Sequence, residues 1–340
     1  MYFINDLKNY LILNRGYINE ILINKIAWFI PFKHLRKFLK TFLIDAVKTF
    51  YRTEYLINVN NKIKQNDNLV ILWVGGGLCG QIRKYILGKY IEKKYNKKVK
   101  YDINWYKYNG LDDIKKLNRN FDLLKIFPDL DFEIANDYEI NIYKSCFHFN
   151  SNPLYQFNDL LLEYKNMYLD GTPYDKNCFY EIKEIIKNKL DFETYLYDKL
   201  DDKNKYILNE IRNCNSVAIH VRRGDFKLYG IVEDNYYINS INEIIKNIKE
   251  PKFFIFSDDI NYVKNNIIKK LSSTVLFSIV DINDNDKGYF YLFLMMNCKH
   301  QIVSNGSFGY FAYCFNKNKD KILITPENMR EYYIENIDKI

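Results

Sequence analysis

The sequence predicts an α/β protein that contains two parallel β-sheets with helices between the strands. Three observations support this prediction. Short apolar runs rich in β-branched residues occur in both halves of the chain, and each is followed by a loop and a segment of helical length. Strands that alternate with helices of this length are typical of parallel sheets. The length of 340 residues allows two domains of ordinary size.

The overall composition indicates a globular protein. Apolar residues make up 48% of the chain and charged residues 27%, which places it outside the disordered class. The net charge of +8 suits an anionic ligand or a membrane surface and proves neither. The six cysteines and four histidines are dispersed without a CxxC pair, so we expect no zinc site and free thiols in a reducing cytoplasm. We also expect neither a signal peptide nor a transmembrane helix, because no continuous apolar run of suitable length occurs.

Residues 1–68 form a predicted basic helical extension. Between residues 21 and 50, aromatic and aliphatic residues alternate with lysines and arginines, and Pro31 divides the segment into two predicted helices. One interpretation is an amphipathic element that lies on the anionic inner face of a membrane. The other is a pair of helices that packs on the rest of the protein. The polar stretch 58–67 suits a linker.

Residues 69–204 form the second predicted domain. It begins with a buried strand at 69–74, followed by a glycine turn, a helix at 79–94 and a second strand at 99–103. The region from about 111 to 200 shows no clear periodicity, and we expect it to be mostly helical.

The glycine turn fits a dinucleotide-binding motif. Gly75, Gly77 and Gly80 satisfy G-x-G-x-x-G between a strand and a helix, and Asp102 follows at the end of the next strand. In NAD-dependent oxidoreductases such glycines admit the pyrophosphate, and the acid binds a ribose hydroxyl. However, a tight strand-to-helix turn in any α/β fold favours glycine, and no catalytic His or Tyr–Lys pair follows. An NAD-dependent oxidoreductase is therefore an alternative rather than the first prediction.

Residues 205–325 form the third predicted domain, and residues 326–340 a C-terminal tail or helix. Strands are expected at 216–221, 252–257 and 300–304, and each ends in conspicuous polar residues. In an open parallel sheet, ligands bind beyond the carboxyl ends of the strands. We therefore expect a ligand site at this edge of the third domain.

The first of these strands runs into two adjacent arginines. Side-chain alternation places His220 and Arg222 on one side of the sheet and Arg223 on the other. A guanidinium matches phosphate oxygens and stays charged in a dry site, so we expect Arg222 to bind a diphosphate. Arg223 is a second candidate contact, or a partner of Asp225 that braces the loop. A surface cluster of ion pairs is the competing interpretation.

The other two strand ends carry further candidates. Ser257, Asp258 and Asp259 follow the second strand, where a carboxylate can accept hydrogen bonds from guanine or ribose, or can cap the helix that follows. Asn305 and Ser307 follow the third strand, at the start of the last core helix. Backbone N–H groups at a helix N-terminus bind phosphate without a side-chain charge.

The segment from His220 to Phe226 (HVRRGDF) resembles the H-x-R-R-G-D-Y motif of bacterial α-1,2-fucosyltransferases in glycosyltransferase family 11. The resemblance extends through 256–259, 284–300 and 304–315. Residues 76–85 (GGLCGQIRKY) are similar to the family's G-G-L-G-N-Q-x-F-Q-Y motif. The likeness covers about residues 69–330, and the motifs in their correct order are far more specific than any one of them.

The resemblance implies a GT-B-like fold, in which two Rossmann-like domains with parallel sheets face a cleft. It also implies inverting transfer of L-fucose from GDP-fucose to a galactose-type hydroxyl of a surface glycan such as lipopolysaccharide, without a cofactor or metal. No nucleic-acid partner is expected. The residues expected to bind GDP-fucose are Arg222, Arg223, Ser257, Asp258, Asn305, Ser307, Phe308, Gly77 and Gln81.

The catalytic candidates are Arg222, Asp225 and His220. Inversion requires the acceptor hydroxyl to lose its proton, and either Asp225 or a group of the predicted domain 69–204 can take it. Three departures from the family motifs bear on the acceptor and the linkage more than on the donor. They are Cys79-Gly80 for Gly-Asn, Arg83 for an aromatic residue, and Tyr310-Phe311-Ala312 for Trp-Trp-Gly. A non-catalytic glycan-binding relative is the second alternative.

Overall fold

The computed structural model describes residues 31–41, 43, 68–108, 119–146, 148–151, 166–171, 182–224, 231–283 and 287–327. The chain divides into two compact units, and each is composed of three stretches of sequence. Unit 1 comprises Met1–Val74, Gly88–Ile103 and Phe132–Asp175. Unit 2 comprises Gly75–Leu87, Asn104–Asp131 and Lys176–Ile340.

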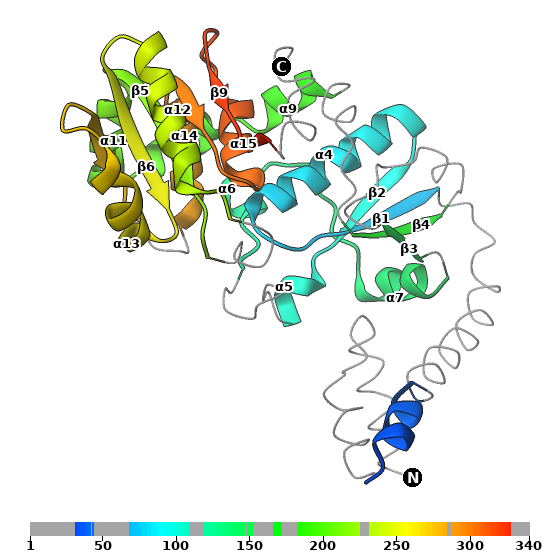
Figure 1. Ribbon diagram of the computed structural model, residues 1–340. Coiled ribbons are helices and arrows are strands. Elements are labelled where there is room, and N and C mark those ends of the chain that lie inside the picture. The colour runs from blue at the N-terminus through cyan, green and yellow to red at the C-terminus, as the bar shows by residue number, and fades with distance from the viewer. Residues whose placement is uncertain are drawn as a thin grey trace. The chain divides into compact units, whose positions relative to one another are not determined.

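Unit 1 is built on a four-stranded parallel sheet in the order β2–β1–β4–β3 (Figure 1). The strands are β1 (Leu69–Trp73), β2 (Lys98–Asp102), β3 (His148–Ser151) and β4 (Met167–Gly171). The central strand β1 is a continuous apolar run, and its residues 70–72 are fully buried, as expected of a strand covered on both faces. Helix α7 (Asp137–Cys146) contacts β3 and β4.

Helix α4 (Leu78–Tyr95) follows the glycine turn and leads to β2. Gly76 has a φ of 80°, a left-handed conformation that favours glycine. At Gly88 the helix lies so close to β2 that the ring of Tyr101 occupies the space of a Cβ atom. The first part of α4 belongs to unit 2 and the remainder to unit 1.

Unit 2 contains a five-stranded parallel sheet in the order β7–β6–β5–β8–β9. Its strands are β5 (Asn215–Val221), β6 (Pro251–Ser257), β7 (Leu276–Ile279), β8 (His300–Ile302) and β9 (Leu323–Ile324). The chain moves outward from β5 through β6 to β7, then returns to the other side of β5 with β8. The strand order therefore reverses between β5 and β8, and such a switch point is where open α/β sheets bind ligands.

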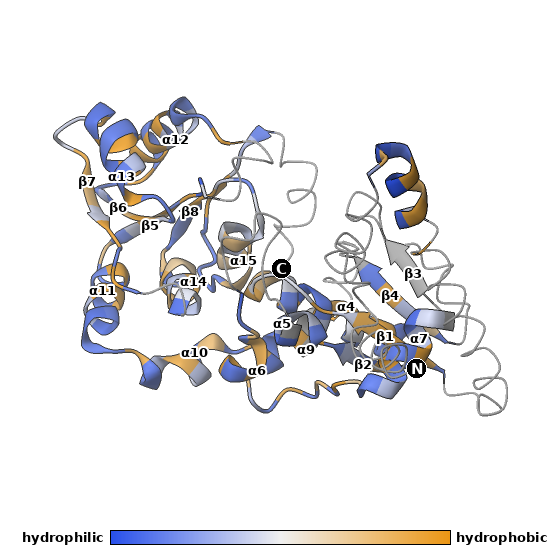
Figure 2. Cartoon of the chain, turned by 90° about the horizontal axis from the view of Figure 1, so that it is seen from below, coloured by the Kyte–Doolittle hydropathy of each residue, from blue (hydrophilic) through white to orange (hydrophobic). Residues whose placement is uncertain are grey.

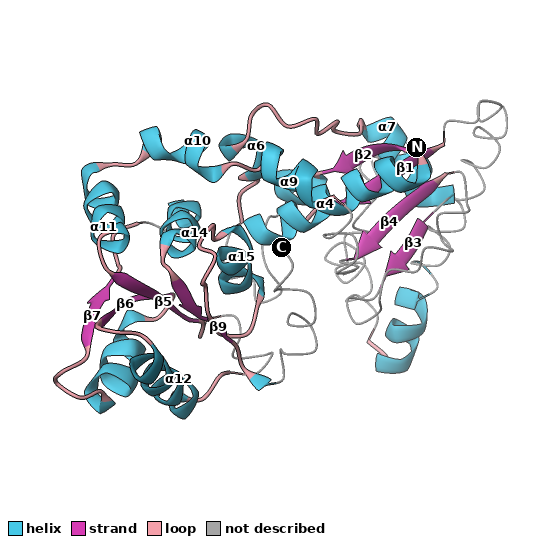
Figure 3. Ribbon diagram, turned by 90° about the horizontal axis from the view of Figure 1, so that it is seen from above, coloured by secondary structure: helices cyan, strands magenta, loops and turns pink. Residues whose placement is uncertain are grey.

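Helices cover both faces of this sheet (Figure 3). One face carries α12 (Asp234–Asn247) and the helical segment that begins with α13 (Ile260–Tyr262); the other carries α11 (Asp202–Arg212), α14 (Gly288–Asn297) and α15 (Ser307–Phe315). Figure 2 shows the apolar stripe of α12, where Tyr237, Ile241 and Ile244 recur at helical spacing and pack on the sheet. Burying one such side chain stabilises the fold by roughly 1.5–3 kcal/mol. The remaining helices are α5 (Asn104–Tyr108), α6 (Leu123–Ile126), α9 (Lys183–Lys189) and α10 (Phe192–Leu196).

The two parallel sheets and five predicted strands are confirmed, as is the helix predicted at 79–94. The described part of the middle region contains more helix than strand, as predicted, but the strands β3 and β4, which were not expected, also lie within it. Strands β7 and β9 were not expected, and β8 ends two residues before the predicted position. Strand β7 lies at the edge of the sheet, where Leu276 is 60% exposed.

Most of the predicted N-terminal extension lies outside the described residues. Within it, residues 33–41 are helical. Most of the predicted C-terminal tail also lies outside the described residues. In the part of the chain that the structure describes, every helix is too short or too polar to span a bilayer.

Candidate active site

Arg222 and Asp258 lie at the carboxyl ends of the neighbouring strands β5 and β6. The Nη1 atom of Arg222 is 2.8 Å from Oδ2 of Asp258, and the two side chains are 19% and 24% exposed. The guanidinium is thus partly accessible to solvent at the edge where the sequence predicts a ligand. Because a guanidinium carries five N–H donors, its pairing with one carboxylate does not exclude an anionic ligand.

Asp258 also holds the turn that follows β5. Its Oδ1 accepts a hydrogen bond from the N–H of Arg223 at 2.8 Å, and its Oδ2 accepts one from the N–H of Gly224 at 3.1 Å. A Cβ atom at position 224 would lie 2.9 Å from Oδ2, a distance that side-chain carbon atoms do not tolerate. The glycine of the Arg-Arg-Gly sequence therefore allows the close approach of this carboxylate, which a larger residue would force to shift.

The neighbouring Asp259 is a helix cap. Its side chain accepts a hydrogen bond from the N–H of Tyr262 at 2.9 Å, at the start of α13. The hydroxyl of Ser257 accepts one from the N–H of Asp259 at 3.0 Å. The two adjacent acids after β6 thus have different roles, since Asp259 starts a helix and Asp258 binds the arginine turn.

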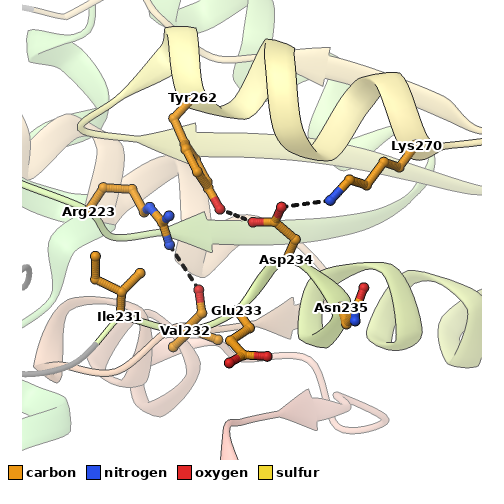
Figure 4. Close-up of a pocket in the computed structure, with 8 residues that line it drawn as sticks. All are labelled: Arg223, Ile231, Val232, Glu233, Asp234, Asn235, Tyr262 and Lys270. Carbon is orange, nitrogen blue, oxygen red and sulfur yellow. Dashed lines mark hydrogen bonds and ion pairs between the residues drawn. The ribbon is translucent and has the colours of Figure 1, made fainter.

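Arg223 lies beside Tyr262 and Val232 (Figure 4). Its guanidinium lies 3.5 Å from the ring centroid of Tyr262 and donates from Nη1 to the carbonyl oxygen of Val232 at 2.9 Å. Asp234 accepts a hydrogen bond from the Tyr262 hydroxyl and forms an ion pair of 2.7 Å with Lys270. These groups line a cavity of about 420 Å³ whose residues are Arg223, Ile231, Val232, Glu233, Asp234, Asn235, Tyr262 and Lys270. Arg223, Tyr262, Asp234 and Lys270 thus form a chain of contacts on the side of the sheet that carries α12, separate from the pair of Arg222 and Asp258.

His220 lies within β5, two residues before Arg222, and is only 7% exposed. Its Nδ1 is 3.2 Å from the hydroxyl of Ser304, and its ring centroid is 5.6 Å from that of Phe308. Burial, together with the positive charge of Arg222, lowers the pKa of His220 to about 3. The ring is therefore neutral at neutral pH. The third catalytic candidate, Asp225, lies outside the described residues.

The start of α15 lies after β8, on the other side of the switch point. Asn305 is buried, Gly306 has a φ of 99°, and Ser307 is the first residue of the helix. Cys79, near the start of α4, forms a hydrogen bond with Ser307, although its burial raises the pKa of the thiol to about 12. The glycine turn and the β8–α15 turn therefore meet within unit 2. Two helix N-termini placed together favour an anion, because both present N–H groups and positive dipole ends.

Gln81 anchors the glycine turn from inside the protein. Its side chain is fully buried; Nε2 donates to the carbonyl oxygen of Asn120 at 2.9 Å, and Oε1 accepts from the N–H groups of Asp122 and Leu123 at 2.9 Å each. These contacts hold the start of α6 and give Gln81 a structural role. At Gly77, by contrast, a Cβ atom would meet nothing within 4 Å, so the turn is open at that residue.

Asp102, the acid of the predicted dinucleotide motif, is enclosed in unit 1. Its side chain is 1% exposed, accepts a hydrogen bond from the Tyr168 hydroxyl at 2.7 Å and lies 3.4 Å from Nζ of Lys144. A carboxylate paired in this way is not available to a ribose hydroxyl.

Two residues that shape the site were not singled out from the sequence. Gly224 was recognised only as part of a motif, although a glycine after two arginines is itself a signal that another group approaches the backbone closely. Tyr262, which stacks on Arg223, gave no signal because the sequence contains 31 tyrosines.

Comparison with known proteins gives a consistent result. The model of the family Glycosyl transferase family 11 matches residues 90–338, well over half of the chain. An Escherichia coli alpha-1,2-colitosyltransferase is 28% identical over 76% of this chain and 91% of its own length. An Escherichia coli O-antigen biosynthesis glycosyltransferase, WbnK, is 25% identical over 51% of this chain and 59% of its own. The human galactoside alpha-(1,2)-fucosyltransferase 1 is 25% identical over 42% of this chain and 41% of its own.

Similar solved structures include Arabidopsis thaliana FUT1 in complex with GDP, with a TM-score of 0.44, 13% identity and coverage of 88% of this chain and 81% of that one. The NodZ alpha-1,6-fucosyltransferase co-crystallized with GDP has a TM-score of 0.41, 11% identity and coverage of 73% and 92%. Neither TM-score reaches 0.5.

The family match overturns the alternative of an NAD-dependent oxidoreductase, and the enclosure of Asp102 explains why the glycine motif was misleading. The matched residues include the arginine turn after β5. This chain belongs to glycosyl transferase family 11 and is a glycosyltransferase.

Proposed function

We propose that the protein is an inverting α-1,2-fucosyltransferase that moves L-fucose from GDP-fucose to a galactose-type hydroxyl of a surface glycan. The observation that carries the proposal is the arrangement at the switch point of unit 2. There Arg222 follows β5, and the start of α15 at Ser307 follows β8. The relatives named for α-1,2 transfer of colitose and fucose support the linkage.

In the proposed reaction, the acceptor oxygen attacks the anomeric carbon while the bond between that carbon and the phosphate oxygen breaks. The electron pair of the broken bond stays on the diphosphate. Arg222 and the N–H groups at the start of α15 stabilise this negative charge. We propose that they take the place of a metal ion. The fork of the guanidinium suits two phosphate oxygens.

The proton of the acceptor hydroxyl must pass to a base. A base is most effective when its pKa lies near the working pH, so His220, with a pKa of about 3 and a buried ring, is poorly suited. We keep Asp225 as the candidate base, and a group of the predicted domain 69–204 is the alternative. Arg223 is bound to Val232 and Tyr262, so we assign it to the support of the turn rather than to the diphosphate.

Colitose is a second candidate for the transferred sugar, because the relative named alpha-1,2-colitosyltransferase matches this chain over 91% of its own length. Colitose is L-fucose without the 3-hydroxyl group, so the two GDP-sugars share the nucleotide and most of the sugar. The same diphosphate site serves both.

The test measures GDP release by the purified chain with GDP-fucose or GDP-colitose across a panel of galactosides, followed by linkage analysis of the products. We expect transfer to the 2-hydroxyl of a galactoside, and transfer that is slower by about 10²- to 10³-fold in the Arg222→Ala variant. A thermal-shift series with GDP and NAD accompanies it, since a ligand at about 100 times its Kd adds about 2.7 kcal/mol of stability. Stabilisation by GDP without turnover on any acceptor would favour the non-catalytic glycan-binding alternative.

We also propose that the segment 21–50 contacts an anionic membrane on its cytoplasmic side. In its described part, Phe32, Leu35 and Phe38 recur at three-residue spacing and are 69%, 53% and 67% exposed. Basic residues lie between them, which suits a helix at the surface of an anionic bilayer. In a flotation assay, the full chain is expected to float with phosphatidylserine vesicles and not with neutral vesicles. A Phe32→Ser/Phe38→Ser variant is expected not to float with either. Equal flotation with both vesicle types would contradict the proposal.

A further inference from the structure

The pairing between β5 and β8 stops short of the site. The register runs from Val217 with His300 to Ile219 with Ile302, and β8 ends there. Beyond this point the end of β5, which leads to Arg222, and the turn that leads to α15 are no longer joined by strand pairing. Side chains must therefore set the distance between these two parts.

The ring of His220 fills this position. Its Nδ1 lies 3.2 Å from the hydroxyl of Ser304, two residues beyond the end of β8, and its ring lies against Phe308 in the first turn of α15. At Gly309 a Cβ atom would lie 3.1 Å from Nδ1 and 2.8 Å from Cγ1 of Val303. One side chain of β5 thus touches both the turn and the helix start, and the missing Cβ at position 309 allows this contact.

The hydrogen bonds define the state of the ring. The Ser304 hydroxyl also contacts the carbonyl oxygen of Asn305 at 3.2 Å. Because a hydroxyl carries one hydrogen, both contacts are satisfied when Ser304 donates to Asn305 and the ring donates from Nδ1 to Ser304. A second proton on this ring would place a buried positive charge beside Arg222, and burial with that charge accordingly lowers the pKa of His220.

We infer that His220 is a positioning residue whose neutral ring fixes the start of α15 relative to Arg222. It acts through the turn and the helix, and it exchanges no proton with the substrate. The inference deepens the proposed function, since the groups that it places are those assigned to the diphosphate. It accounts for a histidine two residues before the arginine pair without making it a base.

The closing experiment compares three variants of the full chain with the wild type. His220→Ala removes the ring and its contacts, whereas His220→Asn keeps an N–H donor close to the position of Nδ1. His300→Ala is the matched control, because His300 is equally buried in the same sheet but lies at the opposite end of β8, where its Nδ1 accepts from the N–H of Ile322. Calorimetric binding of GDP, hydrogen exchange of residues 304–310, and the pH profile of kcat are measured for each.

A positioning role predicts that His220→Ala weakens GDP binding by roughly 10- to 100-fold, because small displacements of binding groups have effects of that size. It also predicts faster hydrogen exchange in residues 304–310, rescue of both properties by His220→Asn, and little change in His300→Ala. The pH profile of kcat in His220→Asn should keep the wild-type shape. Unchanged exchange and GDP affinity in His220→Ala would overturn the inference.

A role as general base predicts a different pattern. His220→Asn would then bind GDP normally, lose about 10²- to 10⁴-fold in kcat and lose one limb of the pH profile, which also overturns the inference. Failure of the proposed function is recognised separately, as a wild-type protein that does not bind GDP. In that case the hydrogen exchange of residues 304–310 still decides whether His220 holds the turn.

Discussion

Arg222 and Asp258 are joined at 2.8 Å across the ends of β5 and β6, and the same carboxylate binds the two backbone N–H groups that follow Arg222. Asp258 therefore fixes both the guanidinium and the turn that carries it. Exposed ion pairs usually contribute at most about 1 kcal/mol. Here three donors converge on one partly buried side chain, so its loss is expected to affect the site more than the loss of a surface pair.

The first prediction concerns the arginine itself. We expect Arg222→Ala to reduce transfer by about 10²- to 10³-fold, because it removes a preorganised donor to the departing diphosphate. The melting temperature should change little, since the side chain is partly exposed. The control is Arg212→Ala, which removes a surface ion pair of 2.7 Å with Glu193 and should leave kcat unchanged. Turnover like that of the wild type in Arg222→Ala would refute the assignment.

The second prediction separates the two adjacent acids after β6. Asp259→Ala removes the cap of α13 and should lower the free energy of unfolding by about 1 kcal/mol with little effect on kcat/KM. Asp258→Ala should lower kcat/KM sharply, because Arg222 and the turn lose their anchor. Urea denaturation and initial rates measure the two quantities. Equal effects of both variants on kcat/KM would show that Asp258 has no special role.

The third prediction compares two glycines. Gly224→Ala should destabilise the protein by about 1–3 kcal/mol and lower activity, because the new methyl group would collide with Oδ2 of Asp258. Gly77→Ala should leave stability near that of the wild type, since its Cβ meets nothing within 4 Å. If the diphosphate lies against the glycine turn, Gly77→Ala raises KM for the donor. An unchanged KM would place the donor elsewhere.

The fourth prediction concerns stability against pH. The pKa of His220 is about 3 in the folded protein and near 6.5 in the unfolded chain. Below pH 6.5 the unfolded chain binds a proton that the folded chain does not, so the free energy of unfolding falls as pH falls from about 6.5 toward 3. The slope is at most about 1.4 kcal/mol per pH unit for this residue. Stability above pH 6.5 should be independent of it.

Denaturation of the wild type and His220→Asn between pH 5 and 7 measures this slope. His300, whose pKa is also lowered by burial, contributes to both proteins and cancels in the comparison. Most carboxyl groups titrate below this range. Parallel pH dependence in the two proteins would contradict the assigned burial of the His220 ring.

The sequence contained enough information to place the buried strands and the edge where they end. The runs at 69–74 and 253–256 are apolar throughout, because both faces of such strands are covered. The alternation that separates Arg222 from Arg223 is a local property of a strand, and in the structure the two arginines have different partners. Local periodicity could therefore predict both the sheets and the different partners of the arginines.

Contacts between distant parts of the chain had no local signal. The hydrogen bond between Cys79 and Ser307 joins two turns that the sequence separates widely, and nothing in either turn identifies the other as its partner. Gln81 matched a family motif and was expected at the substrate, yet its amide binds backbone groups that lie about 40 residues further along the chain. Strand β3 (HFNS) is short and mostly polar, so its composition does not distinguish it from a loop.

The three-part composition of unit 2 has a practical consequence for protein engineering. A fragment that starts at Lys176 would omit Gly75–Leu87, and with it the Cys79 contact to Ser307 and the amide of Gln81. Chimaeras that exchange the C-terminal halves of two relatives at a single crossover would lose the same contacts. Such chimaeras should instead take the glycine turn and the C-terminal sheet from the same relative.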